Sequence, residues 1–201
     1  MRCLPWLAGL VLVLLPAFAV AQPTLPSIGE VQLLGGSPLF LTLDAEGEGP
    51  LTFSVQTSDA LVTATVLADN RSLRMQVAGF GEMVFELFDF AARRVTDRIV
   101  QLADSGFYDG VIFHRVIDNF VIQGGDPTGT GSEGSPLGDF DDQFHVDLQH
   151  NRTGILSMAK SFDDTNDSQF FITSGATRWL DQRYTAFGFL TSGEAVRNSG
   201  S

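Results

Sequence analysis

Residues Phe107–Asp126 of this 201-residue chain read FYDGVIFHRVIDNFVIQGGD. The stretch contains two runs rich in Val, Ile and Phe, Val111–Val116 and Phe120–Gln123, with an Ile-Asp-Asn turn between them. β-branched and aromatic residues bounded by Gly, Asp and Asn favour two strands joined by a turn. Arg115 lies among the apolar side chains of the first run, and its guanidinium keeps its charge at any accessible pH. Burying that charge without a partner is costly, so Arg115 is either paired with a carboxylate at a sheet edge or used for function.

Four further motifs follow this stretch in the chain. They are GILSMA at 154–159, NDSQFFIT at 166–173, WLD at 179–181 and FG at 187–188. Together with FHRVIDNFVIQGGDPTGTG at 113–131, and in this order, they resemble the cyclophilin family of peptidyl-prolyl isomerases. The resemblance extends from about Arg74 to the C-terminus. It implies a mostly β fold, an antiparallel β-barrel with one or two helices and an active groove on its outer face.

The resemblance implies an enzyme that catalyses cis–trans isomerisation of X–Pro bonds without covalent chemistry or a cofactor. Rotation about a peptide bond faces a barrier of ~18–20 kcal/mol, because the C–N bond has partial double-bond character. A catalyst needs only to weaken that resonance and to prefer the twisted state. A positive donor near the prolyl nitrogen and an apolar pocket for the ring meet these needs. The rival interpretation is a non-catalytic module that binds or displays proline-containing peptides.

By the same resemblance, Arg115 is the catalytic arginine. The implied substrate-binding positions are Phe120, Val121, Gln123, Ala159, Lys160, Ser161, Gln169, Phe171, Trp179, Leu180 and Tyr184. Gln123 is implied to orient Arg115, and residues 159–161 to form an edge for the substrate backbone. Two positions depart from the commonest family pattern, because Lys160 replaces Asn and Tyr184 replaces His. No metal and no cofactor are implied, and the predicted partners are proline-containing segments of unfolded or exported proteins.

The composition favours a β-rich core and excludes a typical nucleic-acid-binding surface. The chain has 17 Phe and 21 Gly, which suit packed strands joined by tight turns. Its formal net charge of -12 at pH 7 repels phosphate backbones. Ahead of the strand–turn–strand, Ser72–Val77 and Met83–Phe88 predict strands, and Ala91–Asp104 predicts a helix capped by Asp89.

The first 21 residues have the pattern of a signal peptide. Arg2 precedes an apolar run, Leu7–Val20, and Ala19-Val20-Ala21 fits a small-x-small cleavage site. A membrane anchor is the competing interpretation, and cleavage would leave no stable membrane span. Cleavage would also remove Cys3, the only cysteine. Export without disulfides predicts a periplasmic location, or an extracellular or cell-envelope one.

Residues 22–72 predict a β-rich extension or a partial cadherin-like or immunoglobulin-like module ahead of the isomerase domain at 73–201. Within them, Leu51–Val55 and Leu61–Leu67 alternate as strands do. At the other end of the chain, no apolar run follows Glu194–Arg197. The C-terminal strand that closes the family's barrel is therefore expected to be missing, which would leave two unpaired sheet edges.

Three patterns suggest ligand sites but are incomplete. The glycines of 129–134 have the spacing of a dinucleotide loop, yet no helix pattern follows them. The run Asp163–Asp167 lacks the Gly and the closing Glu of a calcium loop. His145, Asp147 and His150 lack the further ligand that a zinc site needs. We interpret these segments as surface loops and turns.

Overall fold

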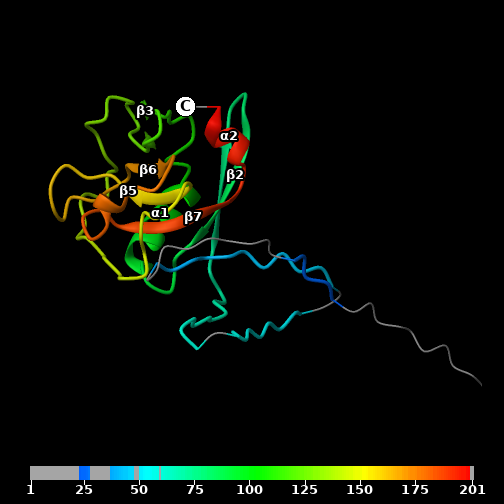
Figure 1. The fold of residues 1–201 in the computed structure, drawn as a ribbon. Coiled ribbons are helices and arrows are strands. Elements are labelled where there is room, and N and C mark those ends of the chain that lie inside the picture. The colour runs from blue at the N-terminus through cyan, green and yellow to red at the C-terminus, as the bar shows by residue number, and fades with distance from the viewer. Residues whose placement is uncertain (1–22, 28–36, 48–49, 59, 200–201) are drawn as a thin grey trace, which may run out of the picture. The chain divides into compact units, whose positions relative to one another are not determined.

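The computed structural model describes residues 23–27, 37–47, 50–58 and 60–199. The chain divides into two compact units, residues 1–29 with 43–54 and residues 30–42 with 55–201. In the first unit, Thr24 and Glu46 form an isolated antiparallel bridge in which each backbone N–H donates to the other residue's carbonyl. The helices and strands of the described residues all lie in the second unit (Figure 1).

The second unit is built on a seven-stranded antiparallel sheet. In chain order, its elements are β1 (Ser72–Val77), β2 (Gly81–Leu87), α1 (Arg93–Asp104), β3 (Arg115–Ile117), β4 (Val121–Gly124), β5 (Ile155–Met158), β6 (Phe170–Thr173), the 3-10 turn η1 (Arg178–Leu180), β7 (Ala186–Ser192) and α2 (Glu194–Asn198). Across the sheet, the strand order is β1-β2-β7-β5-β6-β4-β3. The mostly β fold with two helices, predicted above, is confirmed.

The main core lies between the sheet and helix α1. Its buried side chains come from β2, α1, β5, β6 and β7, and they include Phe85, Ile99, Leu156, Ile172 and Phe187. Every second residue of β2 from Met83 to the strand end is buried, as strand alternation requires. Figure 1 shows β5, β6 and β7 side by side with α1 beside them. Alternation in β2, one apolar stripe on α1, and strands β5 and β6, which are buried throughout, therefore account for the core.

Asp89 does not cap α1, contrary to the prediction. The helix has no side-chain cap, and Asp89 instead accepts hydrogen bonds from the Arg71 guanidinium at 2.6 Å and the Thr96 hydroxyl at 2.6 Å. Burial alone would raise the pKa of Asp89, but these hydrogen bonds lower it to about 2. The carboxylate is thus used to join the start of β1 to α1, because a charged partner binds it more strongly than a helix end does.

The strands expected at Leu51–Val55 and Leu61–Leu67 do not form. Both segments lack helix and strand, and the side chains of Leu61 and Val62 are exposed. Alternation alone does not make a strand, because a strand needs a partner to satisfy its backbone groups. Closer to the N-terminus, Phe40 packs within the second unit, with its ring centroid 4.6 Å from that of Phe88.

The signal segment predicted at residues 1–21 lies outside the described residues. Within the described part of the chain, no helix combines the length and the hydropathy that crossing a membrane requires.

The sheet has two edges, β1 and β3, and each of these strands pairs on one side only within the described residues. We therefore expect amide hydrogen exchange in β1 to be faster than in β5 and β6, which have strands on both sides. Exchange followed by mass spectrometry on peptides covering 72–77, 155–158 and 170–173 measures the difference. Equal protection of all three would contradict the expectation and would show that another segment covers β1.

Candidate functional site

The strand–turn–strand predicted within Phe107–Asp126 forms, but its first strand is shorter than predicted. β3 covers only Arg115–Ile117, and the preceding residues 111–114 are irregular. The turn that follows contains Asn119 with φ of 57°, a left-handed conformation that Asn tolerates better than most residues. The turn returns the chain antiparallel, so that Arg115 of β3 pairs with Gln123 of β4.

The register then places several of the predicted site residues in one row across the sheet. Gln123 pairs with Phe171 of β6, and Phe171 pairs with Ser157 of β5. Paired residues of neighbouring strands point to the same face, so Arg115, Gln123 and Phe171 share one face. The alternate row, which contains Ile172 and Leu156, belongs to the main core on the opposite face. Two-residue periodicity therefore separates the site from the core.

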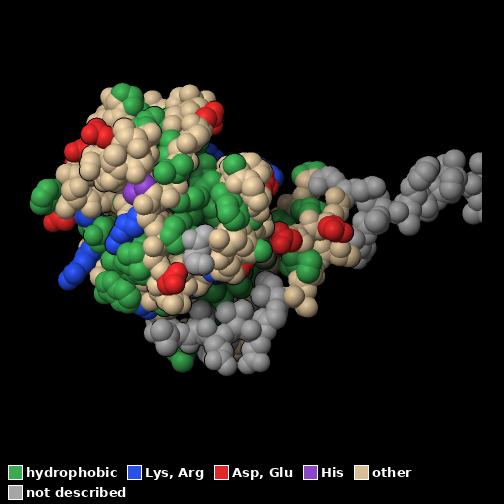
Figure 2. All heavy atoms as spheres, turned by 90° about the horizontal axis from the view of Figure 1, so that it is seen from above, with side chains coloured by type: hydrophobic (Ala, Val, Ile, Leu, Met, Phe, Trp, Pro, Cys, Tyr) green, Lys and Arg blue, Asp and Glu red, His purple; other side chains and the backbone are tan. Residues whose placement is uncertain are grey.

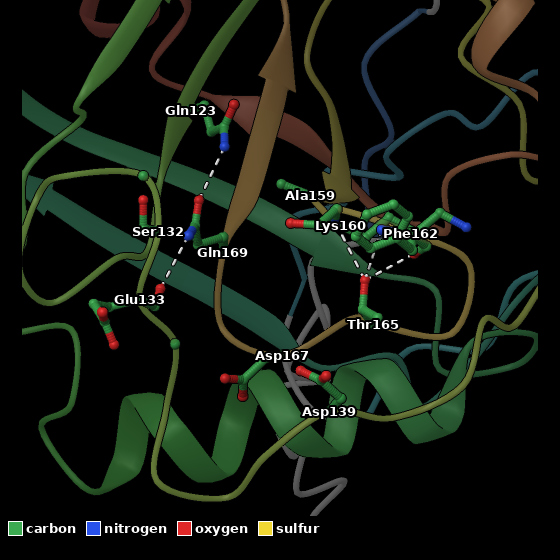
Figure 3. Close-up of a pocket in the computed structure, with 13 residues that line it drawn as sticks. Gln123, Ser132, Glu133, Asp139, Ala159, Lys160, Phe162, Thr165, Asp167 and Gln169 are labelled. Carbon is green, nitrogen blue, oxygen red and sulfur yellow. Dashed lines mark hydrogen bonds between the residues drawn. The ribbon is translucent and has the colours of Figure 1, made fainter.

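A chain of hydrogen bonds orients Arg115. Its Nη1 donates to Oε1 of Gln123 at 3.2 Å, and Nε2 of Gln123 donates to Oε1 of Gln169 at 3.0 Å. Gln169 in turn donates to the backbone carbonyl of Glu133 at 2.9 Å (Figure 3). Each amide both accepts and donates, so the two glutamines link the exposed guanidinium to a loop on the far side of the site.

A second, smaller apolar cluster lies next to this row. Its buried members are Val121, Phe171 and Leu180, and Phe120, Ala159 and Tyr184 pack against them. The Tyr184 ring meets the Phe171 ring edge-on with centroids 5.7 Å apart, and Phe120 stacks on Trp179 at 6.0 Å. Figure 2 shows that hydrophobic side chains gather along the middle of one face of the molecule. We call the six residues of this cluster the ring pocket, after the proline-binding role that the resemblance implies for most of them.

A pocket of about 360 Å³ continues from Gln123 and Gln169 (Figure 3). It is lined by Gln123, Gly131, Ser132, Glu133, Gly134, Asp139, Ala159, Lys160, Ser161, Phe162, Thr165, Asp167 and Gln169. Residues 159–161, which the resemblance implies to border the substrate backbone, therefore line the same pocket as Gln123 and Gln169. The N–H of Ser161 already donates to the Thr165 hydroxyl at 3.2 Å, and the N–H of Ala159 donates to the Gln169 carbonyl at 2.9 Å.

Asp126, which sequence reasoning missed, organises the loop that borders this pocket. Its fully buried carboxylate accepts hydrogen bonds from the backbone N–H groups of Thr128, Gly131, Ser132 and Glu133. Burial alone would raise the pKa of Asp126, but the hydrogen bonds hold it well below its ordinary value. The glycine pattern at 129–134 is therefore a loop wrapped around a carboxylate, in keeping with its interpretation as a surface loop.

His150, Ser157 and Asp181 form a second group that the sequence did not reveal. Nδ1 of His150 lies 3.0 Å from Oδ1 of Asp181, and Nε2 lies 2.9 Å from the Ser157 hydroxyl. The imidazole stacks on Phe171 with ring centroids 5.9 Å apart. The spacing resembles a Ser-His-Asp triad, but His150 and Ser157 are fully buried, so no substrate carbonyl can reach the hydroxyl. We infer that the group supports the ring pocket from beneath.

The stability of the protein should decrease as the pH falls from 7 to 5, in part through His150. Burial lowers the pKa of His150 below 6.5, and Asp181 opposes this shift. The unfolded chain therefore takes up a proton that the folded chain does not. As the pH falls below the pKa of this histidine in the unfolded chain, the free energy of unfolding decreases. The limiting slope is about 1.4 kcal/mol per pH unit. Urea unfolding between pH 5 and 7.5 should give a flatter profile for His150→Asn, and equal slopes for the two proteins would contradict this assignment.

The candidate metal sites are not assembled. Within the described ranges, no group of three or more His, Cys, Asp or Glu side chains is arranged to hold a metal ion. His145 lies near Asp147, with 3.8 Å between Nδ1 and Oδ2, whereas His150 is bonded to Asp181 instead. In the acidic run, Asp167 pairs with Arg98 at 3.1 Å.

Comparisons with known proteins identify the family. Residues 72–198 match the family described as cyclophilin type peptidyl-prolyl cis-trans isomerase/CLD. The peptidyl-prolyl cis-trans isomerase ppi1 of Schizosaccharomyces pombe is 53% identical over 118 residues, which are 58% of this chain and 76% of that protein. The peptidyl-prolyl cis-trans isomerase-like 1 of Mus musculus is 44% identical over 120 residues, 59% of this chain and 72% of that protein.

Solved structures agree with the sequence relatives. A cyclophilin type peptidyl-prolyl cis-trans isomerase of Cryptosporidium parvum superposes with a TM-score of 0.63 at 39% identity, over 66% of this chain and 84% of that one. The same enzyme solved in the presence of the dipeptide Ala-Pro gives a TM-score of 0.62 at 40% identity, over 65% of this chain and 84% of that one.

The prediction of an exported protein in the periplasm, the cell envelope or the extracellular space is wrong on these comparisons. The sequence relatives named above, like those of Aspergillus oryzae and Bos taurus, are fungal and mammalian isomerases. The bacterial-type assignment likewise has no support. The location was inferred from the apolar N-terminal run and its small-x-small pattern, which lie outside the described residues.

The match over residues 72–198 spans the sheet, both helices and the row from Arg115 to Phe171. The chain therefore belongs to the cyclophilin-type peptidyl-prolyl cis-trans isomerase family.

Proposed function

We propose that this isomerase uses Arg115 as the donor that accelerates cis–trans exchange at X–Pro bonds, in proline-containing segments of unfolded chains. The observation that carries the proposal is the row in which Arg115, Gln123 and Phe171 share one face of the sheet beside an apolar ring pocket. The family membership supports the same substrate class, as does the related Cryptosporidium parvum structure solved in the presence of Ala-Pro.

In the proposed mechanism, the ring pocket holds the proline and Arg115 acts on the prolyl nitrogen. The planar amide is stabilised by delocalisation of the nitrogen lone pair into the carbonyl. A guanidinium N–H that approaches this nitrogen favours the pyramidal form, in which the lone pair is localised and the C–N bond rotates more freely. The donor stabilises the twisted state and not the planar ground state, so it raises the rate of isomerisation rather than the affinity for the peptide.

The remaining proposed residues restrain the substrate. Gln123 orients Arg115 through the 3.2 Å hydrogen bond and Gln169 holds Gln123, so the donor is preorganised. Ala159, Lys160 and Ser161 are proposed to border the substrate backbone, and Phe120, Val121, Phe171, Trp179, Leu180 and Tyr184 to surround the ring. No step needs a nucleophile, which fits the burial of Ser157 and His150.

A prolyl isomerisation assay tests the proposal directly. The cis fraction of an Ala-Pro peptide is followed as it converts to trans, coupled to a protease that cleaves only the trans form. Acceleration that is proportional to protein concentration would support the enzyme. Tight peptide binding without acceleration would instead support a non-catalytic proline-binding module.

A further inference from the structure

Lys160 is the only lysine of the chain, and its side chain is buried at the junction of two pockets. The side chain is 5% exposed and lines both the pocket beside Gln123 and a second pocket of about 660 Å³ that reaches Tyr184. Figure 3 shows Lys160 beside Ala159 and Phe162, at the side of the first pocket opposite Glu133. A lysine is rarely buried to this extent without a partner, so its surroundings need an explanation.

Two carboxylates and two aromatic rings surround the Lys160 ammonium. Nζ forms an ion pair with Asp142, which is 8% exposed, and a second with Asp163 at 3.0 Å. The same Nζ lies 5.5 Å from the ring centroid of Phe144 and 5.8 Å from that of Tyr184. Burial alone would lower the pKa of Lys160, but the two carboxylates raise it, so the cation is retained at neutral pH.

Asp142 is itself fixed by groups other than Lys160. Its carboxylate accepts hydrogen bonds from the Asn166 side chain at 2.9 Å and from the backbone N–H of Asp164 at 3.3 Å. Its own N–H donates to Asp164 at 2.9 Å. The position of the ammonium is therefore set by a rigid anchor, and a fixed cation can in turn restrain an adjacent ring.

The ring on one side of the ammonium belongs to the ring pocket. Tyr184 contacts Phe171 edge-on and packs against the buried members of that cluster. We propose that Lys160 is a positioning residue, whose ammonium, anchored by Asp142, holds the Tyr184 ring against Phe171 and so sets the shape of the ring pocket. The inference deepens the proposed function and rests on it. The Asn that is common in the family at this position has no charge with which to do this.

A double-mutant cycle between Lys160→Met and Tyr184→Ala tests the proposal. Met keeps an unbranched side chain and removes the charge. The expected result is an increase in both KM and the Kd for an Ala-Pro peptide of about 3- to 10-fold, with kcat changed less. In the Tyr184→Ala background, the same Lys160 substitution should leave KM and Kd nearly unchanged, because the ring through which Lys160 acts is absent. Lys160→Arg should restore most of the affinity.

Arg71→Met is the matched control, since it also removes a partly buried cation from two carboxylates, Asp89 and Asp97. It should lower Tm without raising KM. If Lys160→Met does not fold, the double variant Lys160→Met, Asp142→Asn also removes the carboxylate charge that Lys160 had neutralised. This double variant then replaces Lys160→Met in the double-mutant cycle. The inference is overturned if folded Lys160 variants bind like wild type, if the effect is equal with and without the Tyr184 ring, or if Arg71→Met raises KM equally. Absence of turnover in wild type would refute the proposed function instead, and the Kd cycle would still decide the role of Lys160.

Discussion

Arg115→Ala is expected to lower kcat/KM for prolyl isomerisation by on the order of 10²–10³, the usual effect of removing one preorganised donor from a transition state. The loss should fall mainly on kcat, because in the proposed mechanism the guanidinium acts in the twisted state and the ring pocket binds the ground state. Arg115 is exposed and lies on the edge strand β3, so the truncation should leave the fold intact. Protease-coupled kinetics and a thermal melt on the same sample measure the two effects separately.

Arg74→Ala is the matched control for this experiment. Arg74 lies on β1, at the opposite edge of the sheet, and its side chain is 70% exposed and paired with Glu82. It should retain wild-type kinetics, which would show that loss of one surface arginine does not itself reduce turnover. Near-normal turnover in Arg115→Ala would refute the proposed mechanism. A loss shared by both variants would point to net charge rather than to a specific donor.

Phe171→Ala is expected to reduce both proline-peptide affinity and stability. The side chain is 5% exposed and packs between the His150 imidazole and the Tyr184 ring. Truncation of a buried phenylalanine typically costs about 3–5 kcal/mol of unfolding free energy, because a cavity remains where the ring was. The same cavity removes one wall of the ring pocket. Urea unfolding and titration with an Ala-Pro peptide measure the two losses.

Phe187→Ala separates these two effects. Phe187 is fully buried in the main core and does not belong to the ring pocket. It should lose stability to a similar extent while the folded protein keeps its affinity for the peptide. If Phe171→Ala loses stability but binds peptide as the wild type does, Phe171 is a core residue and the ring pocket has been assigned to the wrong place.

The fold near the site could be predicted from the sequence because its causes are local. Two short runs rich in Val, Ile and Phe and the turn at Asn119 produce β3 and β4, because strand and turn propensity act between chain neighbours. The proposed site residues came from a resemblance to a family, and the structure brings Arg115, Gln123 and Phe171 into one row. Where local evidence was weaker, the prediction failed. Leu51–Val55 alternates, yet it pairs with no strand among the described residues, and a small-x-small pattern led to an incorrect location for the protein.

The sequence by itself determined the mostly β architecture, the strand–turn–strand around Arg115 and, through its motifs, the family. Only the tertiary structure decided which partners the buried polar groups take. His150 meets Asp181 across 31 positions and Lys160 meets Asp142 across 18, and no local pattern marks either pair. The physical reason is that strand and turn propensities act between neighbours in the chain. A buried charge, in contrast, pairs with an opposite charge that the strand register and the loops place close to it, and that charge can be far away in the sequence.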